Sequence, residues 1–225
     1  MGSDQAQCED GRCTSVSLDM VPAFVEALDV LVETREAGTI KADIAYGGVY
    51  YALIDVDQLG LSIAPENARE LATLGASFKN SINAQVSVQH PIFKDINEIA
   101  YVMFRNRLTD TLYQTCTTLP PGRVDRSPCG TGSSANLATL HARKRVTVGD
   151  ELESHSIIGG RFRVELRGEG ELEGRTVIHP RVTGRAWVYG FHQLGVDPDD
   201  PLAEGFMLSD TWGAELATMM AGSGI

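Results

Sequence analysis

The sequence predicts an α+β fold in which a curved, mostly antiparallel sheet wraps around one central helix. Most of the chain alternates between apolar and polar residues in the short runs that are typical of strands. Two helical segments interrupt these runs, an amphipathic one at residues 65–84 and one rich in small residues at 133–143. Because glycine-punctuated strands flank the second segment on both sides, we expect the sheet to enclose it.

The first strands lie before the amphipathic segment. Val16 and Leu18 stand two residues apart, and the same period continues through residues 25–34. Two apolar runs within residues 40–57 are separated by Gly47-Gly48, and glycine suits a turn or a bulge. We therefore expect residues 40–57 to form a β-hairpin.

The amphipathic segment begins with Pro65, which suits the first turn of a helix. The apolar residues that follow it at spacings of three and four are Leu71, Leu74, Phe78 and Ile82. This spacing places them on one face of a helix, so the sequence predicts a helix over 65–84.

Strands are expected again after each helical segment. The segments that carry a strand pattern are residues 84–89, 99–106, 111–119, 155–166, 174–182, 184–194 and 202–212. Glycines and acidic residues at 168–174 indicate a solvated hairpin tip, and the Asp and Pro residues at 197–201 indicate a turn.

The charge and the apolar content of the chain bear on two kinds of partner, nucleic acid and membranes. Thirty acidic and nineteen basic residues give a formal charge of −11, and the basic residues form no run or stripe. A nucleic-acid partner is therefore not expected. The sequence has no apolar stretch long enough to span a membrane, and its polar start, residues 1–12, is expected to be a flexible leader.

The cysteine spacing favours free thiols. Cys8, Cys13, Cys116 and Cys129 include no CxxC pair. Neither a zinc site nor a disulfide framework is expected from this pattern, and no metal is assigned. Free thiols are typical of a reducing compartment, so we expect a cytoplasmic protein.

The stretch DRSPCGTGSSA, residues 125–135, carries the chemistry that is easiest to interpret. Cys129 stands where the second helix should begin, and the unpaired N–H groups of a helix N-terminus stabilise a thiolate. The N–H groups of Gly130, Thr131 and the following glycine can form a cradle for a carboxylate. Asp125 can accept a hydrogen bond from an amine. The stretch can therefore hold an amino acid and contact its α-carbon.

A second interpretation of this cysteine stays open at this point. Free cysteine is among the most frequently buried residue types, so Cys129 can also be an inert thiol in a turn that leads into a helix. For Cys116, which lies at strand spacing between apolar residues, the inert interpretation is favoured.

The motif at 125–135 closely resembles the second-cysteine motif of the proline racemase and hydroxyproline epimerase family, within the diaminopimelate epimerase-like fold. Five further segments resemble landmarks of that family in the same order: SVSLDMVPAFV, DIAYGGVYYALIDV, SIIGGRF, IHPRVTGRAWVYG and DPDDPLAEGFMLSDTW. The resemblance extends from Cys13 to Trp212. Diaminopimelate epimerases also carry Cys-Gly-Thr-Gly, but the preceding Asp-Arg-Ser-Pro resembles the proline branch.

The resemblance implies a reaction that needs no cofactor, neither pyridoxal phosphate nor a metal. Two residues face opposite sides of the substrate α-carbon; a thiolate removes the proton on one side, and a thiol returns one on the other. Carried over by motif, Cys129 is one of these two residues. Asp125 then binds the amine of proline or a hydroxyproline, and Gly130 with Thr131 binds its carboxylate.

One family feature is missing from the sequence. The first lobe of a family member carries a Met-Cys-Gly-His-type motif with the other catalytic residue, and this sequence contains no such motif. The resemblance implies that residues 13–200 form the C-terminal type of lobe and that residues 201–225 form a closing strand and tail that return to the first lobe. The chain is then expected to form a homodimer or to receive the first lobe from a separate chain.

Three functions remain open at this stage. The first is an epimerase or racemase that acts on 4-hydroxyproline or proline. The second is a trans-3-hydroxyproline dehydratase, although family members with a threonine at this motif position favour dehydration, and this chain has Cys129 there. The third is a non-catalytic fragment or carboxylate-binding module. His90 in the segment VQHPIF is expected either to approach the site or, more simply, to have its ring satisfied by backbone groups.

Overall fold

The computed structural model describes residues 5–205. The chain divides into two units, Met1–Arg185 and Ala186–Ile225. Every helix and strand of the described residues belongs to the first unit, in the order β1 (Gln5–Glu9), β2 (Arg12–Asp19), β3 (Phe24–Thr34), β4 (Gly38–Tyr46), β5 (Tyr50–Asp55), α1 (Ala68–Gln85), β6 (Ile99–Arg107), β7 (Leu112–Leu119), β8 (Arg123–Val124), α2 (Gly130–Ala142), β9 (Glu151–Ser156), β10 (Arg161–Leu172) and β11 (Arg175–Gly184). Two short 3₁₀ turns, Val56–Leu59 and Pro65–Asn67, stand between β5 and α1.

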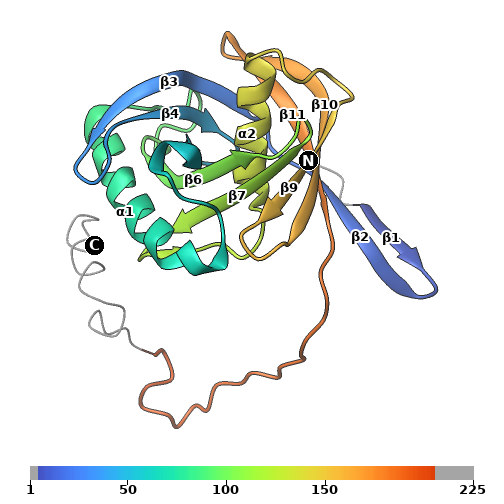
Figure 1. The fold of residues 1–225 in the computed structure, drawn as a ribbon. Helices are drawn as coiled ribbons and strands as arrows, with labels where there is room; N and C mark the ends of the chain where they lie inside the picture. Colours follow the sequence, from blue (N-terminus) through green and yellow to red (C-terminus); the bar gives the residue numbers. More distant parts are fainter. Residues whose placement is uncertain (1–4, 206–225) are drawn as a thin grey trace. The chain divides into compact units, whose positions relative to one another are not determined.

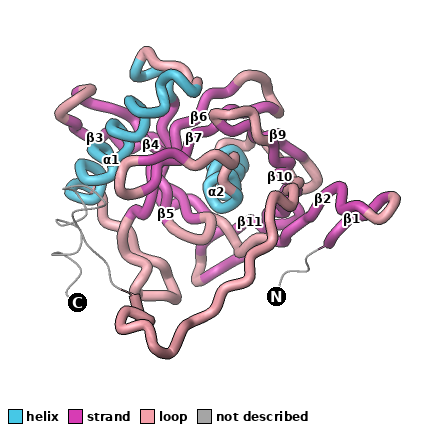
Figure 2. Tube along the Cα trace, turned by 90° about the horizontal axis from the view of Figure 1, so that it is seen from below, coloured by secondary structure: helices cyan, strands magenta, loops and turns pink. Residues whose placement is uncertain are grey.

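A single curved sheet organises the first unit. Its strand order is β1-β2-β11-β10-β9-β7-β6-β5-β4-β3, with β8 beside β7. The pairs β5/β6 and β7/β9 are parallel, and the other pairs are antiparallel. Two backbone hydrogen bonds between Ala23 and Ile178 then join the start of β3 to β11. The sheet therefore curls around α2, as the views across the helix (Figure 1) and along it (Figure 2) show, and the predicted α+β architecture is confirmed.

Strands β5 and β6 are buried on both faces. Because side chains alternate along a strand, Tyr50 and Phe104 lie on the face that packs against α1, whereas Tyr51 and Met103 lie on the face that packs against α2. The hairpin predicted at 40–57 is confirmed as β4 and β5. Its second strand thus sends one tyrosine to each side of the sheet.

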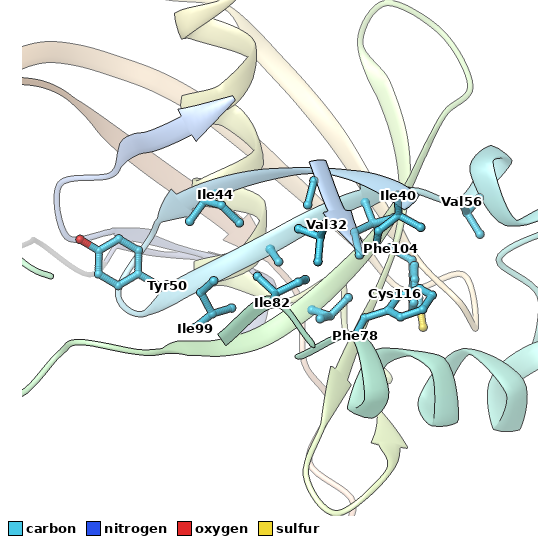
Figure 3. Packing of buried hydrophobic residues seen from close by; sticks show 14 of the residues in the cluster. Val32, Ile40, Ile44, Tyr50, Val56, Phe78, Ile82, Ile99, Phe104 and Cys116 are labelled. Carbon is cyan, nitrogen blue, oxygen red and sulfur yellow. The ribbon is translucent and has the colours of Figure 1, made fainter. Parts of the chain in front are cut away.

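Helix α1 covers the outer face of the sheet with one apolar side. Leu71, Phe78 and Ile82, which the sequence pattern placed on one face, are fully buried there. A Cβ atom on Gly75 would lie 2.2 Å from Thr118 Oγ1, so only glycine lets the helix approach β7 this closely. Cys116 lies in the same cluster beside Phe78 and Phe104 (Figure 3).

Helix α2 is enclosed on all sides. Every residue from 132 to 140 is buried, and the small side chains at these positions let strands approach the helix from several directions. The helix contacts β3, β4, β5, β10 and β11. A helix buried in this way has no face in contact with water, which explains why its sequence lacks the pattern of α1.

A buried group of charges holds the second half of α2. Arg105 on β6 donates hydrogen bonds to Asp43 (2.7 Å) and Asp55 (2.6 Å), and also to Asn136 and Thr139 of α2 (3.1 and 3.0 Å). Burial alone would lower the pKa of Arg105, but the charges of Asp55 and Asp43 outweigh it and raise the pKa. The guanidinium thus stays charged inside the protein and fixes α2 against the sheet.

Three sequence expectations are corrected. Residues 5–12, expected to be part of a flexible leader, form β1 and a tight turn into β2. The expected strand at 84–89 does not form, because α1 continues to Gln85 and the side chain of Asn83 bonds to both backbone groups of Ile99, in place of a strand. Of the strand expected at 184–194, only Gly184 lies in a strand, as the last residue of β11.

The second unit is described from residue 186 to 205, without a helix or strand in that range. Its apolar side chains are exposed, with Tyr189 at 98% and Phe191 at 94%. An apolar strand pattern forms a strand only where a neighbouring strand accepts its hydrogen bonds, which explains the failed prediction at 184–194. The predicted turn at 197–201 is confirmed by the bond from Asp200 N to Asp197 O (3.1 Å). The strand expected at 202–212 lies largely outside the described residues.

Candidate active site

The candidate site is built at the N-terminus of α2, as the sequence predicted. Cys129 immediately precedes the first helical residue, and its carbonyl accepts the N–H of Ser133 (2.9 Å). Its own N–H donates to the hydroxyl of Ser127 (3.1 Å). The backbone of Cys129 has φ +65°, in the left-handed region that costs a non-glycine residue about 1–3 kcal/mol. The two hydrogen bonds hold the backbone of Cys129 in this unusual conformation.

Two hydroxyl groups surround the sulfur of Cys129. The Sγ atom lies 3.3 Å from the hydroxyl of Tyr51 and 3.7 Å from that of Thr131. These hydroxyls are 2.7 Å apart, so the three groups form a closed triangle. Burial raises the pKa of Tyr51, and the nearby Cys129 raises it further. The tyrosine therefore keeps its proton and can donate it in a hydrogen bond to the sulfur.

Glycines allow the surrounding chain to reach this triangle. A Cβ atom on Gly47 would lie 2.1 Å from the carbonyl oxygen of Thr131, so only glycine lets the β4–β5 turn pack on the helix start. A Cβ atom on Gly132 would lie 2.2 Å from the Met103 side chain and 3.2 Å from both Cys129 Sγ and the Tyr51 ring. Met103 and Tyr51 thus pack closely around Gly132, next to the thiol.

The expected carboxylate cradle lies at the first turn of α2. The first N–H groups of a helix have no acceptor within the helix, and they carry the positive end of its dipole. In this structure those groups belong to Gly130, Thr131 and the next glycine. The open side of Gly130 faces Met20, whose Cε lies 3.5 Å from the position of a Cβ atom on that glycine. An anion at this turn would lie next to the thiol.

Asp125 precedes the helix in the loop after β8. Its backbone N–H donates to Thr117 O (2.8 Å), and its Oδ1 accepts the N–H of Ser127 (2.8 Å). The same Ser127 bonds to Cys129, so one short turn fixes both predicted residues. The turn uses one carboxylate oxygen of Asp125.

The other cysteines and His90 are not brought to this site. Cys116 lies on the α1 side of the sheet, where burial and then the charge of Asp125 raise its pKa to about 12. Cys8 and Cys13 are exposed on the β1–β2 hairpin. His90 is buried, and its Nδ1 accepts the N–H groups of Ile92 (3.2 Å) and Phe93 (3.0 Å). The backbone interpretation of this histidine is confirmed, and burial lowers its pKa.

The sequence did not reveal that Tyr51 contacts Cys129. The signal was present in the alternation of the run Val49–Asp55, which sends every second side chain toward α2. The alternation alone does not say which helix packs against each face of β5.

Across residues 5–205, no group of three His, Cys, Asp or Glu side chains could hold a metal ion. Over the same part of the chain, no helix is long and apolar enough to cross a membrane.

Comparison with known proteins identifies the family. A family model described as proline racemase matches residues 3–207. The chain belongs to the proline racemase family. It is 54% identical over 214 residues to a 4-hydroxyproline 2-epimerase of Allorhizobium ampelinum and 51% identical over 210 residues to one of Agrobacterium fabrum. These alignments cover 95% and 93% of this chain.

Two crystal structures share this fold. A hydroxyproline epimerase from Agrobacterium vitis with bound trans-4-hydroxy-L-proline has a TM-score of 0.87 and 54% identity, covering 96% of this chain and 62% of that one. A probable proline racemase from Agrobacterium radiobacter K84 with bound carbonate has a TM-score of 0.86 and 51% identity, covering 96% and 63%. Our chain spans 62% and 61% of the length of the two curated epimerases.

Proposed function

We propose that this chain carries one half of the active site of a cofactor-independent epimerase that acts on 4-hydroxyproline, or of a racemase that acts on proline. The observation that carries the proposal is the position of Cys129 at the start of α2, beside two hydroxyl groups and the first N–H groups of the helix. The relatives named 4-hydroxyproline 2-epimerase, and the related structure with bound trans-4-hydroxy-L-proline, support this substrate class.

In the proposed reaction the Cys129 thiolate removes the α-hydrogen as a proton. The carbon–hydrogen bond breaks, the proton forms a new bond to sulfur, and the electron pair stays on the α-carbon and spreads into the carboxylate. The N–H groups of Gly130 and Thr131 stabilise this charge, as an oxyanion hole does. Asp125 binds the amine and so directs the α-hydrogen toward the sulfur. A second acid on the opposite face then donates a proton and completes the inversion.

The second acid belongs, in our proposal, to another lobe of the active site. Residues 13–200 are the C-terminal type of lobe, and residues 201–225 are the segment that returns to the first lobe. Two observations support this division: the chain spans only 62% of the length of its epimerase relative, and Tyr189 and Phe191 in the second unit are exposed although they are large and apolar. Such side chains are typical of a surface that another part of a protein covers.

The cysteines and the net charge support the proposed compartment and partners. All four cysteines are free thiols, which supports a reducing, cytoplasmic setting. The formal charge of −11 and the scattered basic residues support a small-molecule ligand and disfavour nucleic acid. The protein partner would be a second copy of this chain, as a homodimer, or a separate chain that supplies the first lobe.

A heavy-water experiment tests the function. Trans-4-hydroxy-L-proline is incubated in heavy water with this chain alone and with this chain fused to the first lobe of the Allorhizobium relative. Proton NMR follows loss of the α-hydrogen, and chiral chromatography follows inversion. We expect both in the fusion and no inversion by the chain alone, because one thiol serves only one face of the α-carbon.

The alternatives predict other outcomes. A fusion that releases water from trans-3-hydroxy-L-proline and leaves 4-hydroxyproline unchanged would identify a dehydratase and contradict the proposal. A fusion that binds hydroxyproline without exchange or inversion would identify a binding module. Inversion by the chain alone would require a second base within it, and Cys8 and Cys116 would be the first residues to replace.

A further inference from the structure

We propose that Tyr51 is a positioning residue that donates a hydrogen bond to the Cys129 thiolate, with Thr131 fixing the direction of that bond. This inference rests on the proposed role of Cys129. It assigns a function to a side chain on β5 that is far from the motif in sequence and in contact with it in space.

The direction of the bonds follows from the charge of the sulfur. A thiolate has no proton and only accepts. Tyr51 has one hydroxyl proton and lies closer to the sulfur (3.3 Å) than Thr131 does (3.7 Å). If Tyr51 donates to the sulfur, the Thr131 hydroxyl can donate to the Tyr51 oxygen over 2.7 Å. Each hydroxyl proton then has an acceptor, and the chain of donors points toward the negative charge.

Packing keeps the Tyr51 ring in this position. Its side chain is 1% exposed. The Tyr101 ring lies 5.6 Å away between centroids, and Gly132 leaves just enough room for the Cε1 edge of Tyr51. The hydroxyl of Tyr51 is thus already in place next to the sulfur before substrate binds. Such preorganisation favours catalysis, because no ordering is needed during the reaction.

The test measures Cys129 itself, without substrate. Iodoacetamide reacts with thiolates, so the rate of modification against pH reports the thiolate fraction. Trypsin places each cysteine in its own peptide, and Cys129 lies in residues 127–143. Replacing Tyr51 with Phe keeps the ring and removes the donor. We expect the midpoint of the Cys129 profile in Tyr51→Phe to move up by about one to two pH units, because a hydrogen bond to a charged group is lost.

Two further variants make the result specific. Tyr101→Phe removes a hydroxyl from the neighbouring ring on the same side of the sheet and should leave the midpoint unchanged. Thr131→Val should move the midpoint in the same direction by less, and Thr131→Ser should restore it. In the two-lobe fusion, Tyr51→Phe should lower kcat and leave KM near its original value.

An unchanged midpoint in Tyr51→Phe, in a chain whose circular dichroism shows an intact fold, would overturn the proposal and leave Tyr51 as a packing residue. If Tyr51→Phe fails to fold, the alkylation midpoints of Thr131→Val and Thr131→Ser test the proposal instead. Because the alkylation profile needs no activity, it stays informative if the fusion proves not to be an epimerase. Failure of the proposed function and failure of this inference are therefore distinguishable.

A separate observation concerns the β1–β2 hairpin. Its two-residue turn, Asp10-Gly11, has both residues at positive φ, and Glu9 pairs with Arg12 across it. In such a hairpin the pair next to the turn is hydrogen-bonded, and the following pair is not. Here that following pair is Cys8 and Cys13. Cα atoms of a non-hydrogen-bonded pair lie about 4.5 Å apart, within the range that a disulfide spans.

We infer that Cys8 and Cys13 form a reversible disulfide. Both thiols are exposed, so a small disulfide such as oxidised glutathione can reach them. One thiolate attacks oxidised glutathione and releases one glutathione thiolate. The second cysteine then attacks the mixed disulfide and releases the other. Two protein thiols are oxidised, and one glutathione disulfide is reduced to two glutathione molecules.

The sequence offers a direct readout of this pair. Arg12 lies between the two cysteines, so trypsin separates residues 1–12 from residues 13–35 unless a disulfide joins them. After treatment with oxidised glutathione, thiol blocking and unfolding, we expect these peptides to appear as one linked species that dithiothreitol separates. Cys8→Ser should instead yield glutathionylated Cys13. Separate glutathionylated peptides, or unmodified ones, from the unaltered chain would contradict the inference.

Discussion

The sheet has a cysteine on each side, and the two sides differ in what surrounds it. Cys116 lies on the α1 side among the rings of Phe78 and Phe104, where its neighbours are apolar (Figure 3). Cys129 lies on the α2 side, where Tyr51 and Thr131 present hydroxyl groups to the sulfur. Both side chains are buried, at 0% and 8% exposure.

Because both thiols are buried, we expect any difference in their reactivity to come from their neighbours. On the α1 side, burial and then the negative charge of Asp125 raise the pKa of Cys116 to about 12, so this thiol stays neutral. On the α2 side, hydrogen-bond donors and a helix N-terminus surround a thiol that is almost as buried. The neighbours of the sulfur decide its chemistry.

The largest expected difference between the two sides is catalytic. In the two-lobe fusion, Cys129→Ala should lower the rate of epimerisation by about 10²–10⁴-fold, because a general acid–base group is lost. Cys116→Ala should leave the rate near that of the unaltered protein. The measurement is inversion of trans-4-hydroxy-L-proline under saturating substrate. Equal losses in the two variants would remove the functional distinction between the two sides.

Loss of a buried charge on the α2 side should lower the free energy of unfolding more than loss of a surface charge. Asp43→Ala removes a partner of both Arg105 and Arg143 and leaves the Arg105 guanidinium partly unpaired in the interior. Loss of one partner from a buried ion pair costs about 3–5 kcal/mol, so we expect a decrease of that size in the free energy of unfolding in urea. Asp110→Ala is the control, since Asp110 pairs with Arg107 at the surface. A decrease no larger than that of the control would show that the buried charges do not hold α2.

The same substitution should have unequal effects on the two cysteines. Cys116→Ser introduces a hydroxyl among apolar side chains, and a buried unsatisfied hydroxyl costs about 1–3 kcal/mol. Cys129→Ser should cost less, because Tyr51 and Thr131 can bond to the new hydroxyl. Urea denaturation of both variants, with Cys116→Ala as reference for the lost sulfur, gives the comparison. A larger loss for Cys129→Ser would reverse our description of the two environments.

The smallest expected effect is a pH dependence that comes from Cys116. Its pKa is about 12 in the folded protein and 9.0 as an unperturbed thiol, so above pH 9 the unfolded chain releases a proton that the folded chain keeps. The unfolded state then binds fewer protons, and stability falls as pH rises from 9 toward 12. Between pH 9 and 10 this contribution is about 1 kcal/mol. Cys116→Ala should flatten the curve by that amount, whereas an unaltered slope would contradict the apolar description of this side.

Much of the fold was predictable from local patterns. The spacing of Leu71, Phe78 and Ile82 fixed α1, because one face of this helix contacts the sheet and the other contacts water. The small residues of 133–143 predicted an enclosed α2. The patterns at 84–89 and 184–194 failed for a shared reason: a strand needs a neighbour, and a neighbour is not a local property.

The candidate site was predictable in part. Cys129, Asp125, Gly130 and Thr131 lie in one continuous stretch, so their proximity follows from the chain itself. Tyr51 reaches the site only because β5 lies beneath the start of α2, a tertiary relation that alternation alone cannot specify. Their roles in catalysis remain our proposal.

The pairing of β2 with β11 has a consequence for how the chain folds. The hydroxyls of Ser17 and Thr183 bond across β2 and β11 at 2.8 Å, although 166 positions separate them in sequence, and Asp19 pairs with Arg181 across 162. Contacts between such distant residues form slowly, because a long loop must close before any stabilisation is gained. During synthesis β2 emerges early and can pair with β1, but it has no second partner until β11 has left the ribosome. Helix α2 contacts β10 and β11, so it is enclosed last, and its apolar surroundings stay open to solvent until nearly the whole lobe has been made.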